Sequence, residues 1–212
     1  QRQMCIRDSS DPSRSWDRET IYETTSWRSN VWKFAGTPIT NGMEKAGAGP
    51  SQELIDSYEM IDGTQPILGY SDAEHLRPIL NTASSYDPKN PYANRDPRFY
   101  ASVYYNGAIR YLDQPNGDVV ETYVGGNCGI SDKVTDIRYT RTGYYMRKFN
   151  NFKSGIGQDA DGLMRIFRLA ELYLNFAEAA YQAVGPDGQV ASKVGAEALS
   201  ARDAVNKIRV RA

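Results

Sequence analysis

The stretch RLAELYLNFAEAAYQAV, from Arg168 to Val184, dominates the fold prediction. Its polar residues recur at steps of three and four, which places them on one narrow stripe of a helix. These are Arg168, Glu171, Asn175, Glu178 and Gln182. Since most other positions are apolar, the helix is expected to bury two or more sides and to need neighbours on both flanks. The residues expected to be buried are Ile166, Leu169, Ala170, Tyr173, Leu174, Ala177, Ala180, Tyr181 and Val184.

A second helix is predicted after this one. Gly185 and Pro186 end the first helix, because glycine adopts the positive φ of a C-cap and proline cannot continue a helix. Alanine-rich faces on both helices predict an antiparallel pair over about residues 163–212, with closely approaching backbones of the tetratricopeptide type. The second helix is expected in AEALSARDAVNKIRVRA, with Ala198, Ala201, Val205 and Ile208 on one face. Because one pair cannot form a stable stack, the covering helices are expected outside this chain.

The remaining sequence is predicted to be loop-rich with short strands and one short helix. RETIYET near residue 18 reads as a strand, and residues 36–50 read as a glycine-rich loop. A helix is predicted from Ser51, with Ser51 as N-cap and Glu53 in the first turn. In DPRFYASVYYNGAIRYL, one set of residues alternates with another before Asn106-Gly107, which predicts a hairpin with a type I′ turn. The alternating sets are Phe99, Ala101, Val103 and Tyr105 on one side and Tyr100, Ser102 and Tyr104 on the other. Further strands are predicted at 119–124 and 143–149.

Composition excludes several classes of protein. The net charge of -1, with 25 basic and 26 acidic residues, gives no overall field for nucleic acid or anionic lipid. The two cysteines, Cys5 and Cys128, imply no disulfide framework, and His75 as the single histidine excludes a site with two imidazoles. No apolar run reaches the length of a membrane span. Residues 1–9, which show no periodicity, are expected to be a non-native leader, and residues 10–212 one incomplete domain.

No catalytic or metal-binding pattern emerges. Asp159 and Asp161 in QDADGLM fit the start of a helix better than a pair of glycosidase carboxylates. The same motif resembles part of a calcium loop but lacks the later glutamate. Cys128 in GGNCGI could pair with His75 only as a thiol–imidazole couple, and a loop residue is the simpler interpretation. We therefore expect no enzyme activity and no cofactor, and bound calcium stays open.

A basic and aromatic run from Arg138 to Phe149 raises the alternative of nucleic-acid binding. Asp132 and Asp136 lie just upstream, and the total charge is balanced. An ordinary amphipathic strand is therefore the favoured interpretation, and no nucleic-acid partner is expected.

Four blocks of sequence carry a family resemblance. PSQELIDSYEMIDG, NRDPRFYASVYYNGA, TGYYMRKF and RLAELYLNFAEAAYQA followed by AVNKIRVRA resemble successive blocks in the C-terminal half of SusD/RagB-type proteins of Bacteroidetes. The resemblance covers roughly residues 18–212. It implies a mostly α fold with a loop-rich α+β portion: a tetratricopeptide-like helix pair packed on irregular segments and short hairpins. Cys5 lacks a preceding lipobox, so it is not assigned as the family's lipidated anchor.

The resemblance also implies a function. Family members are non-catalytic, surface-exposed lipoproteins of the outer membrane that bind an oligosaccharide or polysaccharide. They deliver it to a SusC-like TonB-dependent transporter, and this chain would reach the membrane only through a lipid anchor that lies outside it. Two alternatives stay open: a peptide-capturing RagB-like protein, and a helical-repeat scaffold for protein partners.

Aromatic residues are the candidate ligand contacts, because sugar rings offer apolar faces to aromatic surfaces and hydroxyls to polar groups. The chain has 15 tyrosines and three tryptophans. Tyr100, Tyr104, Tyr144 and Tyr145 lie within the matched blocks, so core or sheet packing is expected for them. The predicted ligand-binding residues lie in loop-like stretches instead: Trp27, Trp32, Tyr86 and Tyr92.

Overall fold

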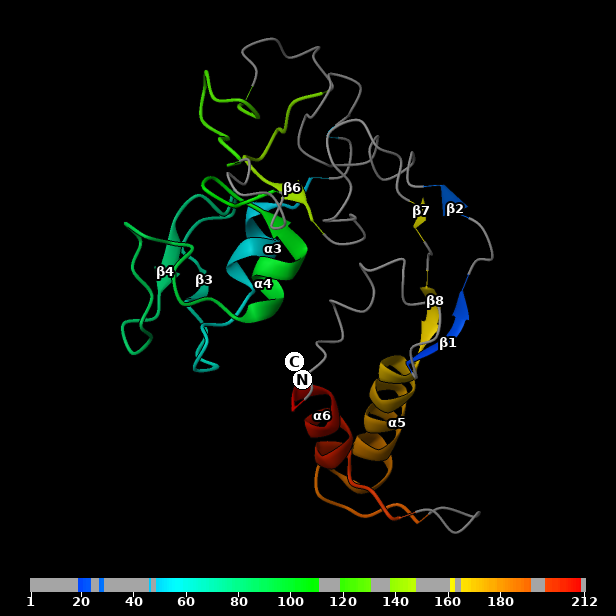
Figure 1. Cartoon of the computed structure of the whole chain (residues 1–212). Coiled ribbons are helices and arrows are strands. Elements are labelled where there is room, and N and C mark those ends of the chain that lie inside the picture. The colour runs from blue at the N-terminus through cyan, green and yellow to red at the C-terminus, as the bar shows by residue number, and fades with distance from the viewer. Residues whose placement is uncertain are drawn as a thin grey trace. The chain divides into compact units, whose positions relative to one another are not determined.

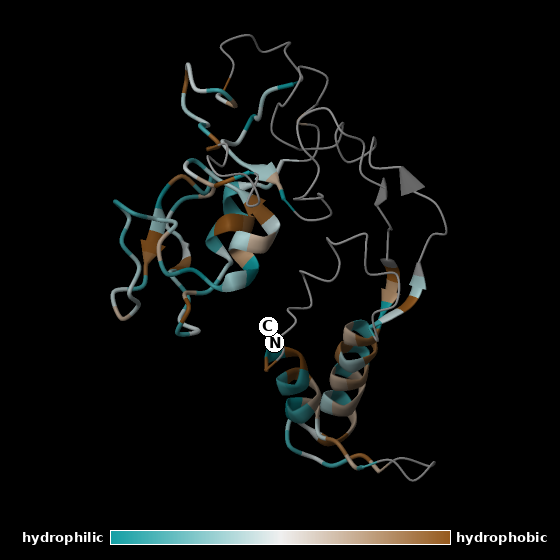
Figure 2. Cartoon of the chain, viewed as in Figure 1, coloured by the Kyte–Doolittle hydropathy of each residue, from teal (hydrophilic) through white to brown (hydrophobic). Residues whose placement is uncertain are grey.

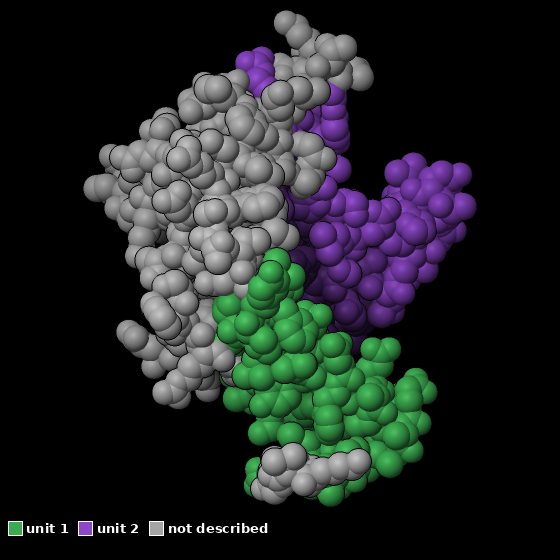
Figure 3. Space-filling model, turned by 90° about the vertical axis from the view of Figure 1, so that its right-hand side faces the viewer, with its two compact units in different colours: residues 1–27, 161–212 green, residues 28–160 purple. Residues whose placement is uncertain are grey.

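The computed structural model describes residues 19–23, 27–28, 46, 49–110, 119–130, 138–147, 161–162, 165–191 and 197–210. The chain divides into two compact units (Figures 1 and 3). One unit contains residues 1–27 and 161–212, and the other contains residues 28–160. As predicted, a pair of helices is combined with loop-rich segments and short strand pairs.

Two strand pairs join the beginning of the chain to the segment before the long helix. Strand β1 (Thr20–Glu23), predicted from RETIYET, pairs antiparallel with β8 (Arg165–Arg168), and β2 (Trp27–Arg28) pairs with β7 (Asp161–Gly162). The prediction that Asp161 starts a helix is therefore wrong, since strand β8 intervenes before the helix. Asp159 lies outside the described residues.

The long predicted helix is confirmed as α5 (Leu169–Val184). Its first amide, that of Leu169, donates to the carbonyl of Glu19 at 2.7 Å, so the residue before β1 satisfies a group that the helix leaves without an internal partner. At the other end Gly185 adopts φ 80°, and its amide donates to the carbonyl of Tyr181. This positive φ is the reason for the glycine.

Helix α6 (Ala201–Arg209) begins later than predicted. Ser200 accepts a hydrogen bond from the Asp203 amide, and the Asp203 carboxylate accepts from the Ser200 amide, which forms a capping box. Ala198 therefore lies before the helix, where the neighbouring Leu199 bridges to Val190. The capping-box sequence, rather than the run of alanines, sets the start.

The two helices pack through small residues, as predicted. Their shared core consists of Ala177, Ala180, Ala201 and Ala204, with Tyr173, Phe176, Val190 and Val205 packed against it. Alanine lets two backbones approach closely, which explains a contact without large side chains at its centre. Ala170 is also buried.

The other flank of α5 remains exposed within this chain. Leu174, Tyr181 and Val184 of α5, together with Ile166 of β8, were expected to be buried, but each is about half exposed, and Leu172 is similar. Coverage of this flank by helices outside the chain stays a prediction.

The second unit is built around two short helices and a hairpin. Helix α3 (Gln52–Asp56) starts at the predicted N-cap, where the Ser51 hydroxyl accepts from the Leu54 amide at 3.3 Å. Strands β3 (Ile67–Tyr70) and β4 (Pro78–Leu80) form an antiparallel hairpin. Figure 2 shows the hydrophobic colour of β4, whose Ile79 and Leu80 are exposed.

The predicted hairpin, with its first strand at residues 99–105, is wrong, and Val103–Tyr104 is the part of that strand that forms. Helix α4 (Pro97–Ser102) occupies its first half, because the Asp96 carboxylate caps the helix and Pro97 fits the first helical position. Strand β5 (Val103–Tyr104) then pairs with the distant β6 (Tyr145–Met146). β6 lies within the strand predicted at 143–149, of which residues 148 and 149 lie outside the described residues.

A turn does follow at Asn106-Gly107, with the Ala108 amide donating to the Tyr105 carbonyl at 3.0 Å. Gly107 has φ 93°, but Asn106 does not have a positive φ, so the turn is not type I′. The strand predicted at 119–124 is reduced to a single bridge between Val119 and Ile109.

Two hydrophobic clusters form the core of this unit. One contains Tyr104, Ala108, Val120, Cys128 and Tyr145, and the other contains Ile55, Phe99, Val103 and Tyr144. Tyr100 packs against the second cluster. The expected packing role of the four tyrosines in the matched blocks is thus confirmed.

Alkaline pH is expected to destabilise this core through Tyr145. Its hydroxyl accepts from the Thr140 amide and donates to the Cys128 carbonyl, and burial raises its pKa from 10.0 to about 12. In the unfolded chain the phenol loses its proton first, so its stabilising contribution is complete below pH 10 and is lost as the pH rises to 12. Thermal melts across this range should show falling stability. A flatter profile is expected for Tyr145→Phe, and an equally steep one would contradict this assignment.

Candidate ligand-binding surface

Helix α3 places a carboxylate and an amide on one face. Gln52 and Asp56 are four residues apart, so their side chains are neighbours on the helix, and Gln52 Nε2 donates to Asp56 Oδ1 at 2.8 Å. Asp56 is buried, and its other oxygen accepts from the Tyr70 hydroxyl at 2.6 Å. Burial and this bond to a carboxylate raise the pKa of Tyr70, which therefore stays a neutral donor.

Two further tyrosines extend this set of contacts. The Tyr144 hydroxyl donates to Gln52 Oε1 at 3.1 Å, and the Tyr92 hydroxyl lies 3.5 Å from that of Tyr144. Tyr92, Tyr144, Gln52, Asp56 and Tyr70 are thus joined in sequence, and we call them the α3 network. It connects the buried cluster around Phe99 to the surface beside the β3–β4 hairpin.

At its outer end, the network meets His75. The His75 ring lies parallel to that of Tyr70, with centroids 4.4 Å apart and 5° between the planes. His75 Nδ1 is 3.4 Å from Glu53 Oε1. The backbone amide and the Ser51 hydroxyl lower the pKa of Glu53, so the carboxylate is ionised at neutral pH. An aromatic face and a hydrogen-bond acceptor therefore lie together at the surface.

A buried arginine supports the same region from below. Arg95 is 1% exposed, and its guanidinium donates to the carbonyls of Ile55, Tyr58 and Pro91 at distances of 2.5, 2.9 and 3.1 Å. Burial lowers the pKa of Arg95, but an arginine remains charged in proteins. Its charge is balanced by carbonyl dipoles in place of water, so the end of α3 is fixed to the segment before α4.

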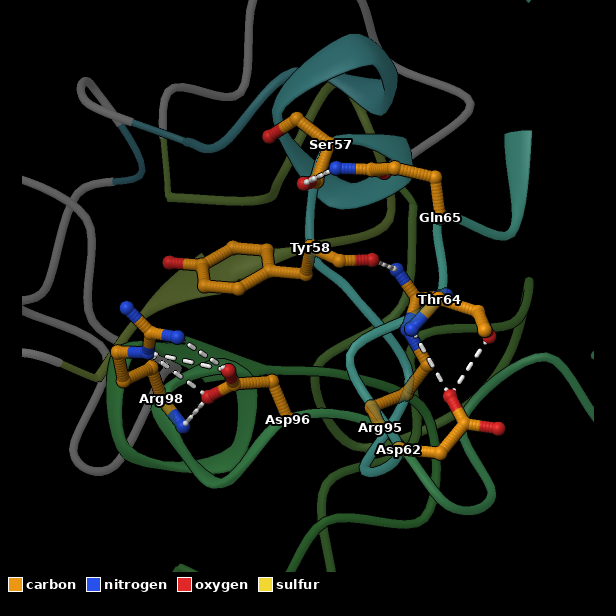
Figure 4. Close-up of polar contacts among 8 residues, drawn as sticks. All are labelled: Ser57, Tyr58, Asp62, Thr64, Gln65, Arg95, Asp96 and Arg98. Carbon is orange, nitrogen blue, oxygen red and sulfur yellow. Dashed lines mark hydrogen bonds and ion pairs between the residues drawn. The ribbon is translucent and has the colours of Figure 1, made fainter. Parts of the chain in front are cut away.

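Short-range contacts hold the connecting segments around Arg95 (Figure 4). Asp62 accepts from the amide and hydroxyl of Thr64, and Asp96 forms a bidentate ion pair with Arg98. Gln65 donates to the Ser57 carbonyl at 3.5 Å. These bonds fix the turns on both sides of the arginine, so the surface residues above it have a rigid base.

The structure brings two of the four predicted ligand-binding residues close to Arg95. The Tyr86 ring is half-buried, with the Arg95 guanidinium 5.7 Å from its centroid, and burial raises the pKa of Tyr86. Tyr92 packs more deeply, against Tyr105 at 4.6 Å and Phe99 at 6.2 Å between centroids. Much of the Tyr92 ring is therefore used in packing, and its hydroxyl lies 3.5 Å from that of Tyr144 in the α3 network.

The structure does not describe the side chains of the two predicted tryptophans. The backbone of Trp27 belongs to β2, but its side chain lies outside the description, and Trp32 lies outside the described residues altogether. Their role as ligand contacts stays a prediction.

Several residues of this surface were not predicted as ligand contacts. The spacing of Gln52 and Asp56 was a usable signal, since glutamine and aspartate four residues apart bond along a helix. Arg95 gave no comparable signal, because arginine is normally exposed. Nothing local in the sequence places His75 against Tyr70.

The groups assembled here suit binding rather than bond cleavage. Phenols, an amide and carboxylates donate to and accept from hydroxyls, and the aromatic rings offer flat apolar faces. Among the described residues, no group of three or more histidine, cysteine, aspartate or glutamate side chains is arranged to hold a metal ion. His75 contacts Tyr70 and Glu53, whereas Cys128 lies in the core beside Tyr145, so the thiol–imidazole couple does not form. No helix in the described part of the chain has the length and hydrophobicity to cross a membrane.

Comparisons with known proteins identify the proteins that this chain resembles. The model of the SusD family matches residues 6–212. A crystal structure of a SusD-like protein from Bacteroides fragilis NCTC 9343 is similar, with 28% identity and a TM-score of 0.67 over 97% of this chain and 38% of that chain. Two structures of a protein designated BT4246, one with selenomethionine, share 19% identity and a TM-score of 0.61. In both cases the similarity covers 96% of this chain, and it covers 35% and 34% of the two matched chains. No curated protein sequence matches.

Proposed function

The chain belongs to the SusD family, and from this premise we propose that it is part of a non-catalytic glycan-binding protein of a nutrient-uptake system. The observation that carries the proposal is the α3 network, which joins phenol, amide and carboxylate groups to a surface aromatic pair. Since the chain spans 38% of its solved SusD-like relative, the ligand and partners of the whole protein are part of the proposal.

The proposed mechanism is shallow, reversible capture. A sugar ring stacks on an aromatic face while its hydroxyls bond to groups such as Glu53 and Gln52, both of which are exposed. Each ring contact contributes about 0.5 to 1.5 kcal/mol, so single sugars bind weakly and longer chains gain from several contacts. Modest affinity lets the ligand leave, and no bond of the ligand is broken.

The proposed partner is a SusC-like TonB-dependent transporter, and the proposed location is the outer surface of the outer membrane. Family membership supports both, because SusD-type proteins are associated with that membrane. A captured glycan would pass to the transporter without chemical change. Modest affinity suits this transfer, since a tightly held ligand would dissociate slowly.

Calorimetric titration against oligosaccharides and oligopeptides tests the proposed ligand class. We expect heat with at least one oligosaccharide. Tyr86→Ala, Trp27→Ala and Trp32→Ala should each weaken binding by about twofold to tenfold, the affinity equivalent of one lost ring contact. Tyr92→Phe tests the contribution of the Tyr92 hydroxyl with its ring retained.

Val124→Ala is the matched control, because Val124 is an exposed aliphatic residue outside the α3 network. Its affinity should equal that of the unaltered chain. Heat of binding with peptides and none with any sugar would instead favour a peptide-capturing RagB-like protein. No heat with either class of ligand would favour a scaffold for protein partners.

A further inference from the structure

We propose that the His75 ring, backed by Tyr70 and flanked by Glu53, is a stacking subsite for one unit of an uncharged sugar chain. The inference rests on the proposed function and adds both a binding residue and a class of glycan to it. The three residues come from the hairpin β3–β4 and from helix α3.

Within the part of the chain that the structure describes, one face of the His75 ring is open to a ligand. Tyr70 covers the other face, since the two rings lie parallel at 4.4 Å. The His75 side chain is nevertheless 49% exposed, and that of Glu53 is 52% exposed. The exposed half of the imidazole is therefore its outer face and its Nε2 edge. Stacking on Tyr70 holds this face in one orientation, which reduces the entropy lost when a ligand binds.

The backbone is built to hold the ring there. His75 adopts φ 58°, a left-handed backbone conformation that residues other than glycine rarely adopt. The Asp72 carboxylate holds the loop by accepting from the amides of Leu76 at 2.9 Å and Arg77 at 2.7 Å. The Ser71 amide donates to the Arg77 carbonyl at 3.0 Å. These hydrogen bonds offset the cost of the left-handed backbone at His75. The result is an aromatic ring that is exposed and held in one orientation.

Hydrogen-bonding groups lie at the edge of this face. Glu53 Oε1 is beside His75 Nδ1, and its carboxylate can also accept from a sugar hydroxyl. His75 Nε2 has no hydrogen-bond partner in the part of the chain that the structure describes, so it is available to a second hydroxyl. A flat face with polar groups at its rim matches the two kinds of surface that a sugar ring presents.

The local charge selects against acidic sugars. The Glu53 carboxylate lies beside the ring, Asp72 and Glu74 belong to the same loop as His75, and Arg77 is the cationic residue of that loop. Arg95, the nearby buried cation, is committed to three backbone carbonyls. A uronic acid or sulfated unit would meet like charge here, so an uncharged unit is the better match.

Nuclear magnetic resonance tests the subsite directly, because His75 is the only histidine of the chain. Its imidazole signals are followed at constant pH while maltoheptaose, cellohexaose, xylohexaose or mannohexaose is added to the 212-residue chain. At least one of these should shift the signals in a saturable way, and hexagalacturonate should not. No shift with any neutral probe, or a saturable shift with hexagalacturonate alone, would overturn the proposal.

His75→Asn is the informative substitution. Asparagine tolerates a left-handed backbone but removes the ring, so the loop is expected to keep its conformation. Calorimetric affinity for the neutral sugar that shifts the signals should fall by about threefold to tenfold, as expected for one lost aromatic contact. Val124→Ala should leave affinity unchanged.

The two proposals fail in different ways. If calorimetry shows sugar binding while the His75 signals stay in place and His75→Asn binds equally well, glycan binding stands and this subsite is wrong. If no sugar gives heat or any change in the spectrum, glycan binding by this chain is wrong as well.

Discussion

Replacing Arg95 with methionine is expected to lower the free energy of unfolding by about 3 to 5 kcal/mol, because three carbonyls lose a charged donor and each costs about 1 to 3 kcal/mol when left without a partner. The guanidinium is 1% exposed and satisfies the carbonyls of Ile55, Tyr58 and Pro91. Methionine fills a similar volume but donates no hydrogen bond, so buried carbonyls lose their donors. Denaturant unfolding followed by circular dichroism measures the difference.

Arg98→Met is the matched control for this prediction. Arg98 is 38% exposed and pairs with Asp96, and partly exposed ion pairs contribute about 1 kcal/mol or less. We expect the Arg95 variant to be clearly less stable than the Arg98 variant. Equal and small losses would mean that the three carbonyl contacts contribute little to stability.

The second large effect is expected for Phe99→Ala, which should cost about 3 to 5 kcal/mol, as for other buried phenylalanines truncated to alanine. Phe99 is 0% exposed and stacks with Tyr105 at 5.2 Å, with Tyr58 and Tyr100 packed edge-on. The truncation leaves a cavity among aromatic rings that cannot easily collapse. The same unfolding experiment measures it.

Phe99→Leu separates lost volume from lost stacking, since leucine fills more of the cavity than alanine and should cost less. The Arg95 guanidinium also lies 5.3 Å from the Phe99 ring centroid. The combined Arg95→Met and Phe99→Ala variant should therefore lose less than the sum of the single losses. Strict additivity would show that the two residues do not act as one unit.

Elements specified by nearby residues were predicted correctly from the sequence. The cap at Ser51, the length of α5 and its end at Gly185 each depend on residues within a few positions of one another. The alanine contact between α5 and α6 follows from composition along two helical faces. These features need no knowledge of distant parts of the chain.

Errors arose where a local signal was misread or where the partner is distant. Asp96 and Pro97 start a helix, but the alternation in the residues after them suggested a strand. Strand β5 pairs with β6, with Val103 opposite Met146 some forty positions further along the chain, and no local pattern identifies that partner. The capping box of Ser200 and Asp203 starts α6 at Ala201, whereas the alanines before it predict an earlier start.

The candidate surface shows the same division. Tyr86 and Tyr92 were chosen as loop aromatics, and the structure places both near Arg95, although Tyr92 is largely engaged in packing. The assembly of this surface depends on tertiary contacts. Tyr144 reaches Gln52 from a distant segment, and His75, in the loop between β3 and β4, reaches Glu53 on helix α3. Only the spacing of Gln52 and Asp56 on α3 was visible in the sequence.

The central claim is that this protein captures a glycan and does not cleave it. The most direct measurement incubates the protein with the oligosaccharide that gives heat in calorimetry, then recovers the sugar and determines its length by mass spectrometry. The account predicts saturable binding with every recovered molecule at its original length. Shortened products that increase with time and with protein concentration would contradict it.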